Sequence, residues 1–339
     1  MPPRRVRTRR PLLITLLSAI AAVSVALLTG GPVACAATPE WKPDRNVEFN
    51  VQSGAGSGSD VLARTLQSIW QARGLVRPSV TVVNKSPPIA MAHVNQQSAN
   101  GQFLLMASTT FLTNHITGVS PLRFSDFTPI AVLGDEPLIF SVRADSTLKS
   151  GRDLVELLRK QPKALSFGLA AALGNHNHCA VAMVMKEAGG DVRDLKVVVF
   201  DSASKGMIAL VGGHVDVYVT SIDSAVPHIL GGRARALAVS SEKRVRDEMG
   251  TVPTWREQGF DIVASDVRIV AAPPKLSAAQ IAYWDDVFGK TAQSDEWKKF
   301  NSAGYSVPYY LPSREAARLL ETRYELYRGI LTELGLAKQ

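Results

Sequence analysis

A glycine- and serine-rich segment, Ser53–Asp60, constrains the fold of this chain most strongly. It follows Val47–Val51, in which apolar and polar residues alternate as they do in a half-buried strand. It precedes Val61–Arg73, in which the large apolar residues recur on one face of a helix. The pattern therefore predicts a strand, a tight loop and a helix, with Ser59 or Asp60 as the helix N-cap.

Such a loop can hold the anionic group of a small ligand. Glycines let several backbone N–H groups point at one place, and a helix start adds unpaired N–H donors and roughly half a positive charge. A strand-to-helix turn that binds nothing is the alternative that the residues leave open. The candidate ligand-binding residues in this loop are Ser53, Gly54, Ala55, Gly56, Ser57, Gly58, Ser59 and Asp60.

Polar and small residues also follow three other predicted strands. Strands that alternate with helical segments predict an α/β fold with parallel strands, whose carboxyl ends meet at one edge where ligands bind. One of these loops leads into a helix predicted from about His176 to Glu187, so the second half of the chain repeats the order of the first. The further candidates are Ser108, Thr109, Gly174, Asn175, His176, Thr220 and Ser221, unless these residues only cap the following element.

The first 37 residues have the pattern of an export signal. Five arginines within residues 4–10 precede the apolar run Leu12–Leu28, and Ala34-Cys35-Ala36 offers small residues for cleavage. We therefore expect a secretory signal peptide at residues 1–37. Lipoprotein anchoring at Cys35 and twin-arginine export through Arg9-Arg10 are weaker alternatives.

Removing this signal changes the charge and the cysteine content. The formal net charge of +8 falls to +3 without the five arginines, which is too small to indicate nucleic acid or an anionic membrane surface as partner. After the signal, no apolar run is long enough to span a membrane. Cys179 is the one cysteine left, and we predict it to be a small buried residue.

Three kinds of chemistry fit the residues poorly. The glycines of Gly54–Gly58 lack the G-x-G-x-x-G spacing of a dinucleotide site, and no acidic residue follows at the required distance. His176 and His178 lie in the first turn of a predicted helix and point in different directions, unlike the ligands of a helical zinc site. A hydrolytic set of Ser57, His176 and Asp223 lacks the G-x-S-x-G elbow. We expect no catalysis, no metal and no cofactor.

Short motifs along the whole mature chain form a specific combination. They are Gly56–Arg64, Thr113–Gly118, Asp126–Pro129, Ala172–His178, Leu210–Asp216, Ala225–His228, Val252–Trp255 and Leu334–Lys338. With these motifs the chain resembles the solute-binding proteins of the tripartite tricarboxylate transporter family, also called the Bug family. The resemblance implies an α/β fold of the two-domain periplasmic binding protein type (type II-like). Each domain would be a mixed sheet flanked by helices, with the ligand cleft between them.

The two domains are expected to share strands. No low-complexity linker separates the halves of the chain, so we expect the strands Leu138–Val142 and Asp261–Val270 to cross between the domains and form a hinge. Domain 1 would comprise residues 45–139 together with 271–339, and domain 2 would comprise residues 140–270.

The resemblance also implies a function and partners. A protein of this family captures a small carboxylate in the periplasm and delivers it to integral-membrane permease subunits, without catalysis. Backbone N–H groups and ordered waters would hold the carboxylate near Ser53–Asp60, Ser108 and Thr109. The second domain would contribute Gly174–His178 and Thr220–Ser221. We expect a monomer that binds no nucleic acid. The alternatives are a ligand-sensing partner of a membrane receptor and, third, a secreted hydrolase.

One segment departs from the family pattern. Relatives carry a glycine-rich turn after the second strand, whereas this chain has Asn84–Ala90, with prolines at Pro87 and Pro88. Proline has no N–H to donate and holds φ nearly fixed. We therefore expect Ser53–Asp60 to carry more of the binding in its own domain.

Overall fold

The computed structural model describes residues 40–302, 304 and 307–338. The predicted signal peptide, including Cys35, lies outside the described residues. Among the residues that are described, no helix combines the length and the apolar character needed to cross a membrane.

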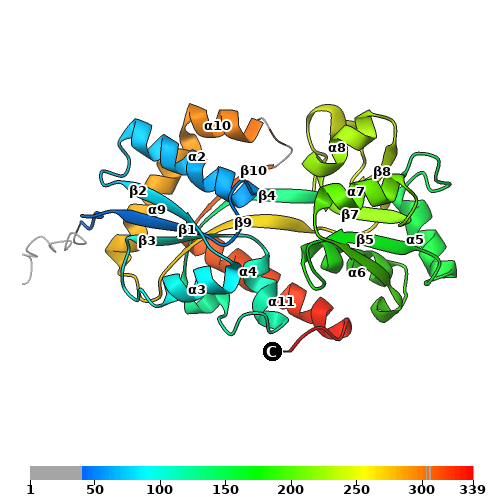
Figure 1. Cartoon of the computed structure of the whole chain (residues 1–339), viewed down its shortest axis with the longest axis horizontal. Helices are drawn as coiled ribbons and strands as arrows, with labels where there is room; N and C mark the ends of the chain where they lie inside the picture. Colours follow the sequence, from blue (N-terminus) through cyan, green and yellow to red (C-terminus); the bar gives the residue numbers. More distant parts are fainter. Residues whose placement is uncertain (1–39, 303, 305–306, 339) are drawn as a thin grey trace, which may run out of the picture. The chain divides into compact units, whose positions relative to one another are not determined.

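The strands follow the order β2-β1-β3-β9-β4-β7-β5-β6, with β8 and β10 pairing with β4. The two halves of this strand order form two lobes (Figure 1). The strands of lobe 1 are β1 (Val47–Val51), β2 (Val80–Asn84), β3 (Phe103–Ala107), β9 (Ser265–Ala272), β10 (Val307–Pro312) and the first part of β4 (Thr128–Arg143). The strands of lobe 2 are β5 (Ser166–Ala170), β6 (Lys196–Phe200), β7 (Val217–Ser221), β8 (Ala234–Val239) and the last part of β4.

Helices cover both faces of the sheet in each lobe (Figure 1). In lobe 1, one face carries α2 (Gly58–Arg73), α9 (Ala278–Gln293) and α10 (Asp295–Ser302), and the other carries α3 (Pro87–Asn95), α4 (Thr110–Ile116) and α11 (Ser313–Glu333). In lobe 2, one face carries α7 (Ala203–Val211) and α8 (Ile222–Leu230), and the other carries α5 (Gly151–Lys160) and α6 (His176–Glu187). Short 3-10 turns lie at Phe124–Asp126, Val192–Asp194, Asp247–Thr251 and Arg256–Gln258.

The strands that precede the predicted site loops are parallel, as the sequence predicts. β1 pairs in parallel with β2 and β3, and β5 pairs in parallel with β6 and β7. The loops after these strands therefore leave each lobe at the same edge of its sheet. This geometry brings sequence-distant loops together, as the α/β fold class predicts.

β4 is the longest strand and joins the lobes. Its residues 128–137 pair with β9 in lobe 1, and its residues 138–143 pair with β7 and β8 in lobe 2. The strand predicted at Leu138–Val142 is thus only the second half of a 16-residue strand. β9 begins at Ser265, not at Asp261, and runs to Ala272.

Large apolar side chains pack in the interior of each lobe and stabilise it. Trp70 of α2 is fully buried against Phe49, Trp284 and Phe288, and its indole N–H donates to the Thr291 hydroxyl at 2.9 Å. A buried indole N–H needs such a partner. In lobe 2, the thiol of Cys179 is fully buried and unpaired, which confirms the prediction of a small core residue.

Candidate ligand-binding site

The glycine- and serine-rich loop forms the start of α2, but the helix begins earlier than predicted. Its N-cap is Ser57, so the prediction of Ser59 or Asp60 is wrong. The Ser57 hydroxyl accepts from the Asp60 N–H at 3.3 Å, and the Asp60 carboxylate turns back to accept from the Gly56 N–H at 2.9 Å. Arg64 also pairs with Asp60, at 3.0 Å. Asp60 therefore stabilises the loop.

Two backbone donors at this helix start remain available. The N–H of Ser57 is bonded to the Gly54 carbonyl, and those of Gly56 and Asp60 are bonded within the loop. For the N–H groups of Gly58 and Ser59, the described part of the chain supplies no partner. Because they are the first two N–H groups of a helix, they add directed donors to its positive end. This is the anion-binding geometry that the sequence predicts.

The absence of a side chain at Gly58 permits a close approach by Arg268. A Cβ atom at this position would lie 3.1 Å from Nη2 of Arg268 and 3.7 Å from its Cζ. The guanidinium therefore packs directly against the helix start. A side chain at position 58 would require the guanidinium to shift. The backbone conformation does not itself call for glycine, because the φ of Gly58 is not positive.

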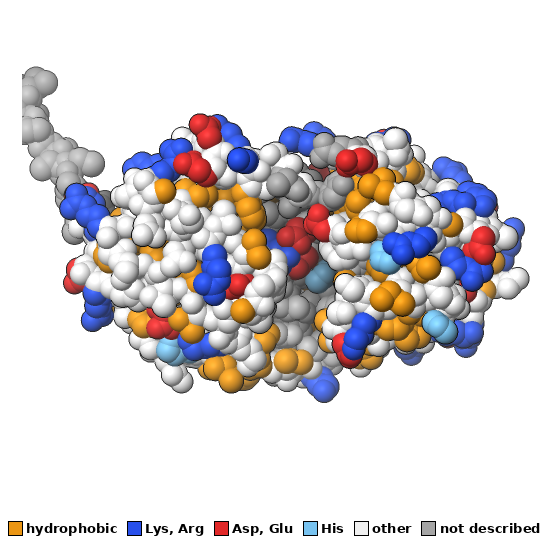
Figure 2. All heavy atoms as spheres, turned by 45° about the horizontal axis from the view of Figure 1, so that its top comes forward, with side chains coloured by type: hydrophobic (Ala, Val, Ile, Leu, Met, Phe, Trp, Pro, Cys, Tyr) orange, Lys and Arg blue, Asp and Glu red, His pale blue; other side chains and the backbone are white. Residues whose placement is uncertain are grey.

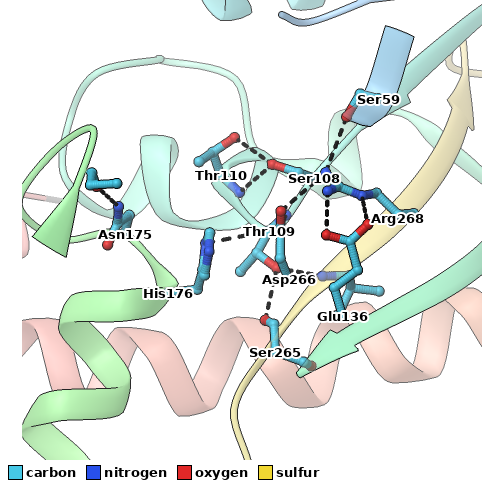
Figure 3. Close-up of polar contacts among 12 residues, drawn as sticks. Ser59, Ser108, Thr109, Thr110, Glu136, Asn175, His176, Ser265, Asp266 and Arg268 are labelled. Carbon is cyan, nitrogen blue, oxygen red and sulfur yellow. Dashed lines mark hydrogen bonds and ion pairs between the residues drawn. The ribbon is translucent and has the colours of Figure 1, made fainter. Parts of the chain in front are cut away.

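Arg268 of β9 is the centre of a buried charged cluster (Figure 3). Its Nε and Nη2 donate to the two carboxylate oxygens of Glu136 at 2.8 and 2.5 Å, and Nη1 donates to the Ser59 hydroxyl at 3.2 Å. Nη1 also lies 3.1 Å from the Asp266 carboxylate. The side chain is only 13% exposed. Each of its three nitrogens thus contacts a protein group.

Asp266 links this cluster to the second lobe. Its carboxylate accepts from the Thr109 N–H at 2.9 Å and lies 3.8 Å from Nδ1 of His176 on α6. Burial by itself raises the pKa of Asp266, but the charge of Arg268, His176 and the Thr109 N–H more than offset this, so the pKa lies below its ordinary value. Asp266 therefore remains ionised beside His176, whose Nδ1 is buried without a hydrogen bond among the described residues.

The two candidates after β3 differ in their availability. Thr109 is fully buried, its hydroxyl donates to the Ser265 carbonyl at 3.3 Å, and the same hydroxyl accepts from the Val267 N–H at 2.9 Å. Its polar atoms tie β3 to β9 and position Asp266. Ser108 is only partly buried, and its hydroxyl lies 3.1 Å from the Thr110 hydroxyl.

The second-lobe loop builds a tightly capped helix start. The predicted helix from His176 to Glu187 is confirmed. Asn175 is its N-cap: its carbonyl oxygen accepts from the His178 N–H at 3.1 Å, and its amide donates to the Ala170 carbonyl at 2.8 Å. Gly174 has a φ of +79° and donates its N–H to Nδ1 of His178. Gly174 and Asn175 thus shape the loop, whereas His176 points toward Asp266 (Figure 3).

Thr220 and Ser221 lie where β7 meets β4. Thr220 is buried opposite Ile139, and Ser221 is opposite Leu138. Ser221 is the N-cap of α8, with its hydroxyl 2.9 Å from that of Ser224. Thr220 and Ser221 thus lie at the start of α8, a different helix of lobe 2 from α6.

The space-filling view shows the surface hollowed between the two lobes (Figure 2). Acidic side chains and a histidine gather in this hollow, where Figure 3 draws Glu136, Asp266 and His176 close to Arg268. Ser59 reaches the cluster from lobe 1 and His176 reaches it from lobe 2. The structure thus brings the predicted helix starts of α2 and α6 to the same charged cluster, whereas Thr220 and Ser221 make their contacts elsewhere.

Sequence reasoning missed Glu136, Asp266 and Arg268. A usable signal was present, because Asp266 and Arg268 alternate with buried apolar residues in an otherwise apolar strand. Charged residues are almost never buried without partners. Their spacing of two places both side chains on one face of β9.

The segment Asn84–Ala90 begins a helix instead of forming an open turn. α3 starts at Pro87 with Ser86 as its N-cap, so its first two positions are prolines. Neither Pro87 nor Pro88 has an N–H to donate. The start of α3 consequently offers fewer donors than the start of α2.

Comparison with known proteins identifies the family. The sequence model for receptors of the tripartite tricarboxylate transporter family, TctC, matches residues 72–336. The chain belongs to this family. Protein BugT of Bordetella pertussis is a similar protein, 23% identical over an alignment that covers 93% of this chain and 97% of its own length.

Solved structures show the same receptor fold. A TctC solute-binding protein from Polaromonas, solved without ligand, has a TM-score of 0.73 at 23% identity and covers 86% of this chain and 99% of its own. A Rhodopseudomonas palustris protein solved with adipate has a TM-score of 0.69 at 21% identity, covering 87% and 99%. The expected two-domain periplasmic binding protein fold of the TctC receptors is confirmed.

The burial of His178 leads us to predict that the stability of this receptor depends on pH. Burial lowers the pKa of His178 to about 4 from 6.5, so the native imidazole stays neutral while the unfolded one binds a proton. The free energy of unfolding should therefore fall as the pH drops from 6.5 to about 4, by roughly 3 kcal/mol. Urea unfolding at pH 7 and pH 4.5 measures this, and His178→Gln should remove most of the difference. His214→Gln, at an exposed histidine, should leave it unchanged; equal pH dependence in all three proteins would contradict the prediction.

Proposed function

We propose that this protein captures a small carboxylate between its two lobes in the periplasm and delivers it to the membrane permease of a tripartite tricarboxylate transporter. The observation that carries the proposal is the pair of N–H donors at Gly58 and Ser59, for which the described residues supply no partner. They lie beside the Arg268 cluster at the start of α2. Membership of the TctC receptor family supports the same role, and the R. palustris structure with adipate supports a carboxylate ligand.

The proposed domains follow the change of partners along β4. Residues 45–139 with 271–339 would form domain 1, and residues 140–270 would form domain 2. In support of the boundary on β4, that strand pairs with β9 up to Pro137 and with β7 from Leu138 onward. The boundary at residue 270 divides β9, because residues 265–270 pair with β3 and β4 of lobe 1. A hinge at this point would let the helix starts of α2 and α6 approach each other.

Binding would use backbone donors supported by a fixed charge. The N–H groups of Gly58 and Ser59 would donate to one end of the carboxylate, and Arg268 would hold Ser59 in place through its hydroxyl. His176 would approach from α6, since it lies at the start of that helix and faces Asp266. Closing the lobes removes water, which strengthens these hydrogen bonds in the lower local dielectric.

The proposed role is binding without turnover, by a monomer. Ser57, the candidate hydrolytic nucleophile, is the N-cap of α2, and its hydroxyl lies 2.5 Å from that of Ser53. His176 lies beside Asp266. The hydrogen bonds of the described residues include none between Ser57 and His176. The remaining proposed contacts are Ser53–Ser57, Asp60, Ser108, Thr109, Gly174, Asn175, Thr220 and Ser221.

A thermal-shift screen tests this function. The exported protein, refolded to strip bound ligand, would be heated with monocarboxylates, dicarboxylates including adipate, and tricarboxylates. A ligand at 100 times its Kd adds about 2.7 kcal/mol, which raises the Tm by several degrees. We expect at least one carboxylate to give this shift, with no chemical change of the ligand in the recovered sample. The absence of any shift, or hydrolysis of the ligand, would contradict the proposal.

A further inference from the structure

A second pocket lies behind the crossing strands, away from the Arg268 cluster. Its volume is about 330 Å³, and its lining includes Asp135, Ser241, Ser265, Tyr309 and Arg323. A further pair of opposite charges, the exposed Glu242 and Lys243, also lines it. Adjacent residues of a strand point to opposite faces. Glu136 therefore faces Arg268, while Asp135 on the opposite face of β4 faces this pocket. On β9, Asp266 likewise faces Arg268 and Ser265 faces the pocket.

The pocket is assembled from both lobes. Residues 240–243 follow β8 in lobe 2, whereas Tyr309 belongs to β10 and Arg323 to α11 in lobe 1. Asp135 and Ser265 lie on the two strands between them. A molecule bound here would touch both lobes at the level of the hinge.

The charged groups of this pocket are incompletely paired. Arg323 is 13% exposed, and its closest approach to Asp135 is 3.9 Å, which is too long for a hydrogen bond. Among the described residues, the Arg323 guanidinium makes no hydrogen bond. Oδ1 of Asp135 and the hydroxyl of Ser241 are buried, and neither has a hydrogen-bond partner among the described residues. Buried polar groups left in this way cost free energy that a suitable ligand would recover.

The neighbouring opposite charges select the class of ligand. A simple anion on Arg323 would be repelled by Asp135, and a simple cation on Asp135 would be repelled by Arg323. We propose that the pocket is a second ligand site for a small zwitterion of the α-amino-acid class. Its carboxylate binds Arg323 and its ammonium group binds Asp135, while its side chain lies against Pro137, Leu319 and Tyr309.

Occupancy of this site is linked to the state of the hinge. Since its walls come from both lobes, movement of one lobe against the other changes the pocket. A zwitterion bound here therefore favours one arrangement of the lobes. It thereby alters the affinity for carboxylate at the proposed site beside Gly58 and Ser59, which we call the front cleft. By linkage, the carboxylate alters zwitterion affinity by the same factor.

Titration calorimetry with glycine, L-serine and L-leucine tests the proposal. We expect saturable binding of at least one probe, weakened at least about tenfold by Arg323→Met and by Asp135→Asn, because each variant removes a charge-assisted hydrogen bond. Arg328→Met is the matched control, since Arg328 lies on the same helix with its side chain 55% exposed. Circular dichroism shows whether each variant is folded, and Arg323→Lys, which keeps the charge, should retain part of the binding.

Gly58→Val separates this site from the front cleft. Zwitterion binding should survive in Gly58→Val, even where that variant has lost carboxylate binding. Three outcomes would overturn the proposal: no saturable binding of any probe, loss in Gly58→Val with retention in Arg323→Met, or acetate binding that Asp135→Asn strengthens. The last outcome would identify a simple anion site.

Discussion

Gly58→Val is expected to abolish tight carboxylate binding. The new Cβ would lie 3.1 Å from Nη2 of Arg268, and the two methyl groups beyond it would displace the guanidinium from Ser59 and Glu136. The same methyl groups would cover the N–H groups that we assign to the ligand. Loss of even one charge-assisted hydrogen bond of about 1.5–3 kcal/mol weakens affinity at least tenfold. Titration calorimetry with the carboxylate that gives the largest thermal shift measures the change.

Gly54→Val is the matched control for this experiment. Gly54 belongs to the same loop, but no atom lies within 4 Å of its added Cβ, and its φ is not positive. We expect its carboxylate affinity to stay within about threefold of the unmodified protein. Gly54 can contact a ligand only through its backbone, which valine keeps, and the N–H groups of Gly58 and Ser59 are unchanged. Equal losses from Gly54→Val and Gly58→Val would show that general loop disturbance, and not the Arg268 contact, controls binding.

Arg268→Met is expected to cause the largest loss of stability. Methionine fills much of the volume but leaves Glu136 and Asp266 without the guanidinium that pairs with both. Removing one partner of a buried ion pair typically costs about 3–5 kcal/mol, because the remaining charge is buried without compensation. Urea unfolding at pH 7 measures the difference.

Two further variants make this prediction specific. Arg328→Met removes an arginine that is 55% exposed and paired with Glu325, so it should cost less than about 1 kcal/mol. Adding Glu136→Gln to Arg268→Met removes one uncompensated charge and should recover part of the stability. A cost below 1 kcal/mol for Arg268→Met, or no recovery in the double variant, would show that the cluster is not held by charge pairing.

Local patterns in the sequence predicted the elements that carry the site. The alternation in Val47–Val51 and the apolar face after Asp60 indicated β1, a loop and α2, and all three are present. The helix from His176 to Glu187 has the predicted bounds. These predictions succeed because periodicity, glycine and capping residues act within a few positions of each other.

Boundaries set by a competition between neighbouring residues were harder to predict. Ser57, Ser59 and Asp60 are all good N-caps, and the fold uses Ser57 because the Asp60 carboxylate instead accepts from the Gly56 N–H. β4 extends ten residues before the predicted Leu138, since β9 and β10 pair with this first part of the strand. Strand length depends on such partners more than on the strand's own residues.

By itself, the sequence determined the α/β class and, through its motifs, the family, and it predicted an export signal and an anion-binding helix start. Only the tertiary structure decided how the charges are used. Glu136 and Arg268 are 132 residues apart, and Asp135 meets Arg323 on α11 behind the same strand. The physical reason is that a strand places successive side chains on opposite faces, while the sheet topology selects which distant residues each face meets.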